Sequence, residues 1–174
     1  MRAETGARWL LRPAAPRDVE VIAELRATVM RADLERLGRF DEHRVRQRLR
    51  DSFSMHYTSA IEVDHALAGC VTVRPAGDGQ WLEHFYLAPH LQGQGLGSAV
   101  LHTLLARTDA QRATVRLNVL QGSPARRLYE RHGFTLESED PIDVLMVRRA
   151  ATQPHPPPPE EPPTKPRDTH TPDP

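Results

Sequence analysis

Apolar positions along the chain follow two spacings, and their alternation predicts a mixture of helices and strands. One helix is expected over residues 16–37, where apolar side chains recur at three- to five-residue steps after the start signals Pro16 and Asp18. A shorter, strongly basic helix is predicted over residues 41–53, and a third over residues 96–109, where leucine and valine side chains share one face.

Runs rich in apolar and β-branched residues predict strands between and after these helices. The expected strands are residues 7–14, 58–64, 67–75, 79–89, 113–120, 134–138 and 143–149, with a fourth helix over residues 123–132. Short links at Asp64-His65 and Gly77-Asp78-Gly79 indicate an antiparallel meander in the middle of the chain. The order βααβββαβαββ predicts an α/β (α+β) fold in which helices flank a mixed, mostly antiparallel sheet.

Composition changes abruptly after Val147 and divides the chain into two parts. Residues 151–174 carry ten of the sixteen prolines and no leucine, isoleucine, valine or aromatic residue. Such a segment cannot bury enough apolar surface to offset its ordering entropy. We therefore expect one folded domain over residues 1–149 and a disordered proline-rich tail over residues 150–174, which is more simply a solvated tail than a ligand for a partner domain.

Charge and cysteine content exclude several classes of protein. The 23 basic and 23 acidic residues cancel, so no net field favours nucleic acid or an anionic membrane. Cys70 is the only cysteine, which excludes an internal disulfide, and His90, His102 and His132 form no metal-binding pattern. No apolar run approaches the ~20 residues that cross a bilayer, and the N-terminus lacks a signal-peptide core, so a cytoplasmic location is expected. Arginine outnumbers lysine, since Lys165 is the only lysine, which is typical of a GC-rich bacterial genome.

The run QGQGLG at residues 92–97 lies between a predicted strand and a predicted helix. Free amides and the helix dipole at such a junction bind anions, usually phosphates. A Walker A loop requires a lysine before Ser98, which this chain lacks, and a dinucleotide fingerprint has a different last spacing. The remaining pattern is Gln-x-x-Gly-x-Gly after a strand, which Gln92, Gly95 and Gly97 satisfy.

On these residues the sequence resembles the GNAT superfamily of acyl-CoA-dependent N-acyltransferases, over about residues 8–149. FYLAPHLQGQGLG resembles the family's acetyl-CoA signature, and LNVLQGSPARRLYERHGF resembles its second signature, with Ala125, Tyr129, Gly133 and Phe134 in place. The resemblance implies an N-acetyltransferase with acetyl-CoA as co-substrate, no metal, and a small-molecule or peptide amine as acceptor. Homodimers are common in the family, so the resemblance is also compatible with a homodimer.

The resemblance also assigns binding roles. Loop amides bind the pyrophosphate while the Leu96 side chain turns into the core, and a strand amide, with Leu87 favoured, holds the thioester carbonyl. The pantetheine arm then lies between this strand and residues 116–119. The implied cofactor-binding residues are Phe85, Tyr86, Leu87, Gln92, Gly93, Gln94, Gly95, Leu96, Gly97, Ser98, Asn118, Ser123 and Arg126. The chain departs from the family where Gly122-Ser123-Pro124 replaces the usual asparagine, although Ser123 can still cap the following helix.

For catalysis, the resemblance nominates Tyr129 as the general acid, since a phenol that stays neutral at pH 7 can protonate a departing thiolate. Glu83 is favoured as the base, acting through water, and His84 is the alternative. Strict strand alternation predicts that Glu83 and Phe85 face one way and that His84 and Tyr86 face the other.

Charged residues between positions 31 and 42 could recognise an amino acid or a small polyamine-like acceptor. An exposed helical hairpin stabilised by i,i+4 ion pairs explains these charges equally well. A non-catalytic acyl-CoA-binding or regulatory module remains the alternative function, and the presence of Tyr129 together with Glu83 favours the enzyme.

Overall fold

The computed structural model describes residues 8–150, and the expected proline-rich tail lies outside these described residues. The elements are β1 (Trp9–Pro13), η1 (Pro16–Asp18), α1 (Val19–Arg36), α2 (Glu42–Ser52), β2 (Thr58–Val63), β3 (Ala66–Ala76), β4 (Gly79–Leu87), η2 (Pro89–Leu91), α3 (Leu96–Ala110), β5 (Val115–Leu120), α4 (Ala125–Arg131), β6 (Thr135–Glu139) and β7 (Asp143–Arg148). The predicted order of helices and strands is confirmed.

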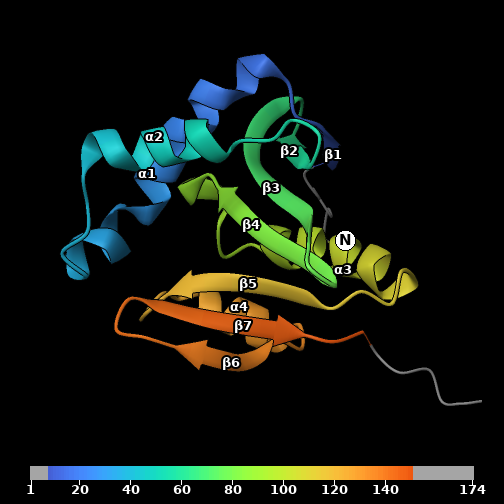
Figure 1. Ribbon diagram of the computed structural model, residues 1–174. Helices are drawn as coiled ribbons and strands as arrows, with labels where there is room; N and C mark the ends of the chain where they lie inside the picture. The colour runs from blue at the N-terminus through green and yellow to red at the C-terminus, as the bar shows by residue number, and fades with distance from the viewer. Residues whose placement is uncertain (1–7, 151–174) are drawn as a thin grey trace, which may run out of the picture.

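The seven strands form one sheet with the order β1-β2-β3-β4-β5-β7-β6. All neighbouring strands are antiparallel except β4 and β5, which confirms the mixed, mostly antiparallel sheet. Helices α1 and α2 lie on one face of the sheet and α3 and α4 lie on the other (Figure 1). Within residues 8–150, no helix combines the length and apolar character needed to cross a membrane.

The two faces of the sheet carry cores of unequal size, because β3 side chains alternate between them. Val71 belongs to the large core, in which Leu101 and Leu105 of α3 are buried against the central strands. Cys70 points to the other face, where it joins a smaller core with Ile22 of α1. The regular alternation of β3 thus attaches both helical layers to the same strand.

Strands β4 and β5 pair only at their beginnings. The parallel register joins Gln80 to Val115, Trp81 to Arg116 and Leu82 to Leu117, and no pairing continues beyond Leu82. Figure 1 shows the two strands diverging toward their carboxyl ends. The second halves of both strands therefore leave backbone groups unpaired at the centre of the sheet.

A β-bulge interrupts β4 directly after this point. Cys70 of β3 pairs with Tyr86, but Thr72 pairs with Glu83, so β4 has one residue more than β3 across this interval. His84 takes up the extra residue with a left-handed backbone, at φ 49°. Such a bulge bends and twists its strand locally, which here accompanies the separation of β4 from β5.

Candidate active site

The glycine run forms an exposed loop that leads directly into α3. Gly93 and Gly95 have φ values of 71° and 86°, and no atom lies within 4 Å of a Cβ built on either one. Glycine is needed here for the left-handed backbone, and its missing side chains also keep the approach to the helix open. Leu96 packs its side chain against the large core, as predicted.

The first turn of α3 has backbone donors without partners in the helix. The first intrahelical bond runs from the N–H of Ala99 to the carbonyl of Gly95, at 3.0 Å. The N–H groups of Leu96, Gly97 and Ser98 precede it, at the positive end of the helix dipole. This arrangement fits a diphosphate, which needs several donors converging from one side.

Two glutamine side chains form hydrogen bonds to the backbone around the same loop. Gln92 Nε2 donates to the Leu87 carbonyl at 2.9 Å, and Gln94 Nε2 donates to the His90 carbonyl at 2.6 Å. In this structure both amides therefore bind the loop's own backbone. They connect the end of β4 to the turn that precedes α3.

The end of β4, the start of α3 and the body of α4 meet at Gly97. A Cβ built on Gly97 would lie 3.5 Å from both Leu87 Cδ1 and Leu128 Cδ2. Leu128 immediately precedes Tyr129 in α4, so the predicted acid lies close to the predicted anion site. The structure thus brings together three segments that are separated in the sequence.

The backbone of Leu87 faces the gap between β4 and β5. Ala88 donates its N–H to Ala68 of β3 at 2.8 Å. Because successive N–H groups of an extended strand point to opposite edges, the N–H of Leu87 points away from β3. It faces the side on which β5 has already separated, where a carbonyl group could accept a hydrogen bond.

Tyr129 lies almost entirely inside the large core, with 7% of its surface exposed. Its ring packs edge-on against Phe134, with ring centroids 5.7 Å apart. Burial raises the pKa of Tyr129 well above its usual range, and the neighbouring Tyr86 adds to the rise. Among the described residues no fully enclosed side-chain oxygen or nitrogen lacks a partner, and the phenol has no hydrogen bond there, so its oxygen keeps contact with solvent.

The bulge in β4 overturns the expected alternation. Glu83 pairs with Thr72 and Tyr86 pairs with Cys70, and both β3 residues point toward α1 and α2. Glu83 therefore lies on the same face as Tyr86, because the extra residue at His84 shifts the alternation by one position. Strict alternation had predicted opposite faces for this pair.

The two candidate bases on this face have different surroundings. Glu83 forms an ion pair with Arg74, with 2.7 Å between Oε1 and Nε. His84 lies between Ser52 Oγ, 3.0 Å from its Nε2, and the Tyr86 phenol, 3.2 Å from its Nδ1. Burial lowers the pKa of His84 most strongly; Glu83 opposes this shift, and nearby arginines add to it. His84 is therefore neutral at pH 7.

Hydrogen bonds connect His84 to the interior through Tyr86. The phenol accepts from Nε of Arg26 at 3.0 Å and so can donate to His84 Nδ1. Burial raises the pKa of Tyr86 to about 12. Sequence reasoning treated Tyr86 only as a backbone contact and did not single out Arg26. The available signal was an arginine four residues after Ile22, on the apolar face of α1.

The remaining predicted residues are more peripheral. Asn118 is exposed on the β5 face opposite Leu117, and Ser123 Oγ accepts weakly from the Ala125 N–H at 3.3 Å. Arg126 pairs with Glu130 one turn later in α4, at 2.9 Å. A separate cavity of about 390 Å³ lies between β1–β3 and the later turns of α3, with Arg107 and Gln111 in its lining, away from the glycine loop.

The charged residues between positions 31 and 42 largely neutralise one another. Arg31 binds Glu35 and stacks over the Phe40 ring, with 4.6 Å from its Cζ to the ring centroid. Arg36 pairs with Asp33, at 2.9 Å. These short-range pairs support the interpretation of an exposed charged hairpin.

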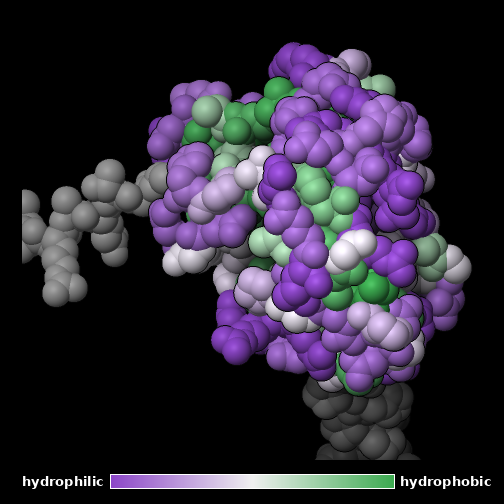
Figure 2. Space-filling view, turned by 90° about the vertical axis from the view of Figure 1, so that its left-hand side faces the viewer, coloured by the Kyte–Doolittle hydropathy of each residue, from purple (hydrophilic) through white to green (hydrophobic). Residues whose placement is uncertain are grey.

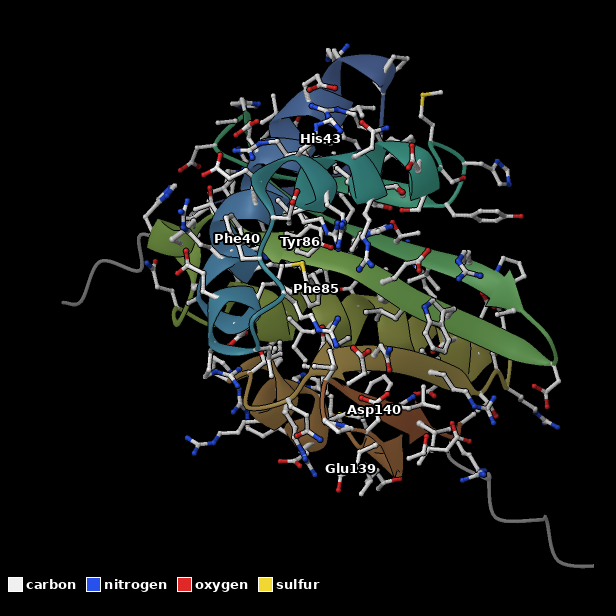
Figure 3. All side chains as sticks on the ribbon, turned by 60° about the vertical axis from the view of Figure 1, so that its left-hand side comes forward. Phe40, His43, Phe85, Tyr86, Glu139 and Asp140 are labelled. Carbon is white, nitrogen blue, oxygen red and sulfur yellow. The ribbon has the colours of Figure 1, made fainter. Side chains whose placement is uncertain are left out.

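The ends of β4 and β5 lie on the same side of the molecule as the connection between α1 and α2. Figure 2 views this side and shows apolar residues between hydrophilic margins. Figure 3 shows Phe40 and His43 near α2, Phe85 and Tyr86 on β4, and Glu139 and Asp140 where β6 ends. Aromatic and ionisable side chains therefore lie near the ends of these strands.

Comparison with known proteins gives one family for this arrangement. Residues 55–136 match the family model of the acetyltransferase (GNAT) domain. A sequence search of the curated proteins returned no match.

Solved structures share the architecture at low sequence identity. The PaiA N-acetyltransferase of Thermoplasma acidophilum, solved with coenzyme A, aligns at 18% identity with a TM-score of 0.67, over 82% of this chain and 99% of its own. The ribosomal-protein-S18-alanine N-acetyltransferase of Escherichia coli gives 16% identity and a TM-score of 0.64, over 84% and 97%. An N-acetyltransferase of Staphylococcus aureus Mu50 gives 17% and 0.62, over 79% and 99%.

At these identities the structural likeness establishes the fold, and the match over residues 55–136 adds the acetyltransferase domain. The diverging strands and the open start of α3 agree with both findings. By the match over residues 55–136, the chain contains an acetyltransferase (GNAT) domain.

Proposed function

We propose that the protein transfers the acetyl group of acetyl-CoA to a primary amine of a small molecule or peptide, by direct attack in a ternary complex. The separation of β4 from β5 beyond Leu82, beside the unpaired first turn of α3, is the observation that carries this proposal. The N–H of Leu87 is suited to polarise a thioester carbonyl, and the N–H groups of residues 96–98 are suited to a diphosphate. These two sets of donors would hold one elongated acyl carrier at separate points.

Tyr129 is the proposed general acid. Attack by a neutral amine forms the C–N bond and breaks the C–S bond, and the phenol gives its proton to the departing thiolate. The proton that the attacking nitrogen loses passes to solvent. The raised pKa of Tyr129 keeps the phenol protonated at neutral pH until a thiolate forms beside it. Its oxygen, which is still in contact with solvent, can be reprotonated before the next turnover.

Glu83 is the proposed acceptor, through water, of the proton that the substrate ammonium group loses before attack. Its position on the face of β4 that points toward α1 and α2 supports this role, although its carboxylate also binds Arg74. His84 is the alternative, since it is neutral and connected through Ser52 to an exposed surface. An ionised carboxylate and a neutral imidazole can each take a proton at pH 7.

The test is to measure thiol release from acetyl-CoA by the full chain while amino acids, polyamines, aminoglycosides and short peptides are added in turn. The expected result is amine-dependent thiol release, with one acetyl group per thiol found on the amine by mass spectrometry. Propionyl-CoA and longer thioesters measure the acyl preference in the same assay. Tight coenzyme A binding with no turnover across the panel would contradict the proposal and favour a non-catalytic acyl-CoA-binding module.

A further inference from the structure

Arg26 of α1 is the most buried arginine in the described part of the chain, with 9% of its surface exposed. Its Nε donates to the Tyr86 phenol at 3.0 Å, and its Nη1 donates to the Val45 carbonyl at 2.5 Å. Neither of these partners carries a charge. Within residues 8–150, none of the ion pairs includes Arg26.

Other partly buried arginines in the molecule do have carboxylate partners. Arg12 binds both Asp18 and Glu62, and Arg148 binds Asp109. A guanidinium group cannot lose its proton under physiological conditions, so burial without a counter-charge is costly. Arg26 is therefore a buried positive charge without a carboxylate partner, at a position where burial makes an unpaired charge costly.

The free end of Arg26 remains accessible. Nη2 has no hydrogen-bond partner among the described residues. Because no side-chain nitrogen in that part of the chain is both fully enclosed and unpaired, Nη2 reaches the accessible surface. It carries two N–H groups, and the planar guanidinium geometry suits a carboxylate.

The surroundings place this donor beside the reacting centre. The Tyr86 phenol that binds Arg26 belongs to the residue directly before Leu87, whose N–H faces the gap between β4 and β5. Glu83 is on the same face but pairs with Arg74, and His84 is neutral there. Figure 3 shows Tyr86 and Phe40 at the same end of the molecule.

We propose that the amine acceptor carries a carboxylate that binds the Nη2 edge of Arg26, which makes amino acids and other small amino carboxylates the substrate class. The inference rests on the proposed acetyltransferase function and adds the chemical identity of the acceptor. The carboxylate supplies the counter-charge that the protein itself does not provide. Tyr86 and Val45 hold the guanidinium in place from its other two nitrogens.

The first experiment compares acceptor pairs on the unmodified full chain. L-methionine is tested against L-methioninamide, and L-lysine against cadaverine, with thiol release from acetyl-CoA as the readout. The amine of L-methioninamide is less basic than that of L-methionine, so a larger fraction of it is neutral and able to attack. This difference favours the amide and therefore opposes the expected preference for the carboxylate. We expect kcat/KM to favour the carboxylate member of a pair by about 10- to 100-fold, as for a charge-assisted hydrogen bond.

The second experiment uses Arg26→Gln, with Arg50→Gln as the matched control. Arg50 also connects α2 to α1, through its exposed ion pair with Glu20, and has no hydrogen bond to Tyr86. We expect Arg26→Gln to abolish the preference between the paired acceptors while coenzyme A binding by calorimetry is retained. Arg50→Gln should keep both the preference and coenzyme A binding.

The outcomes separate the two proposals. Equal turnover of both members of every pair overturns the inference alone, as does a preference that survives in Arg26→Gln. Absence of turnover with any amine refutes the proposed function and the inference with it. If Arg26→Gln does not fold, the acceptor pairs on the unmodified protein decide the matter.

Discussion

Replacing Gly95 tests whether the backbone shape of the loop before α3 creates the acyl-CoA site. Its φ is 86°, and a Cβ built there meets no atom within 4 Å, so Gly95→Ala introduces backbone strain without a clash. A left-handed backbone costs a non-glycine residue about 1–2 kcal/mol, and the stiffer unfolded chain returns about 0.4–1 kcal/mol. The free energy of unfolding should therefore fall by about 1 kcal/mol.

The larger effect is expected on coenzyme A binding. Relief of the strain moves the N–H groups of Leu96, Gly97 and Ser98, which precede the first intrahelical bond of α3. One hydrogen bond to a charged group contributes about 1.5–3 kcal/mol, so the loss of one raises the Kd for coenzyme A by about 10- to 150-fold.

Gly77→Ala is the matched control. Gly77 lies in the turn between β3 and β4, has a φ of 58°, and also has open space where the added methyl group would lie. Both variants should show a similar fall in melting temperature, and only Gly95→Ala should lose affinity in a calorimetric titration with coenzyme A. The reasoning is refuted if Gly95→Ala loses stability but binds coenzyme A as tightly as the unmodified protein.

Three further outcomes are expected. Tyr129→Phe should lower kcat by about 10²- to 10⁴-fold with little change in the KM for acetyl-CoA, and an unchanged kcat would reject Tyr129 as the acid. Glu83→Gln should lower kcat at pH 7 far more than His84→Gln, and the reverse ranking in steady-state assays would assign the base to His84. Asp18→Asn should lower the free energy of unfolding by about 3 kcal/mol at pH 7, because Asp18 is buried against Arg12. Arg12 holds the pKa of Asp18 below its unfolded value, so this stabilisation is present above about pH 4 and is lost as the pH falls through the folded pKa. Urea unfolding at pH 7 and pH 3 should therefore show the two proteins becoming more alike in acid.

Local sequence determines the parts of this fold that depend on neighbours along the chain. Apolar periodicity was sufficient to predict every α-helix and strand in order, because burial of one face of an element requires a regular spacing. The run at residues 92–97 predicted the turn before α3, since Gly93 and Gly95 adopt backbone angles that other residues resist. Leu96 could likewise be assigned to the core from its place at the start of the apolar helix face.

Tertiary structure decides what depends on partners distant in the chain. The bulge at His84 exists only relative to the register of β3, so alternation within β4 alone wrongly predicted that Glu83 and Tyr86 face opposite ways. Arg26 and Tyr86 are 60 residues apart in the sequence. No local sequence pattern predicts that the Arg26 guanidinium on α1 binds the Tyr86 phenol on β4. The physical reason is that the spacing of apolar residues shows only which side of a helix or strand is buried. Strand register and the burial of a charged side chain depend on which other element packs against that side.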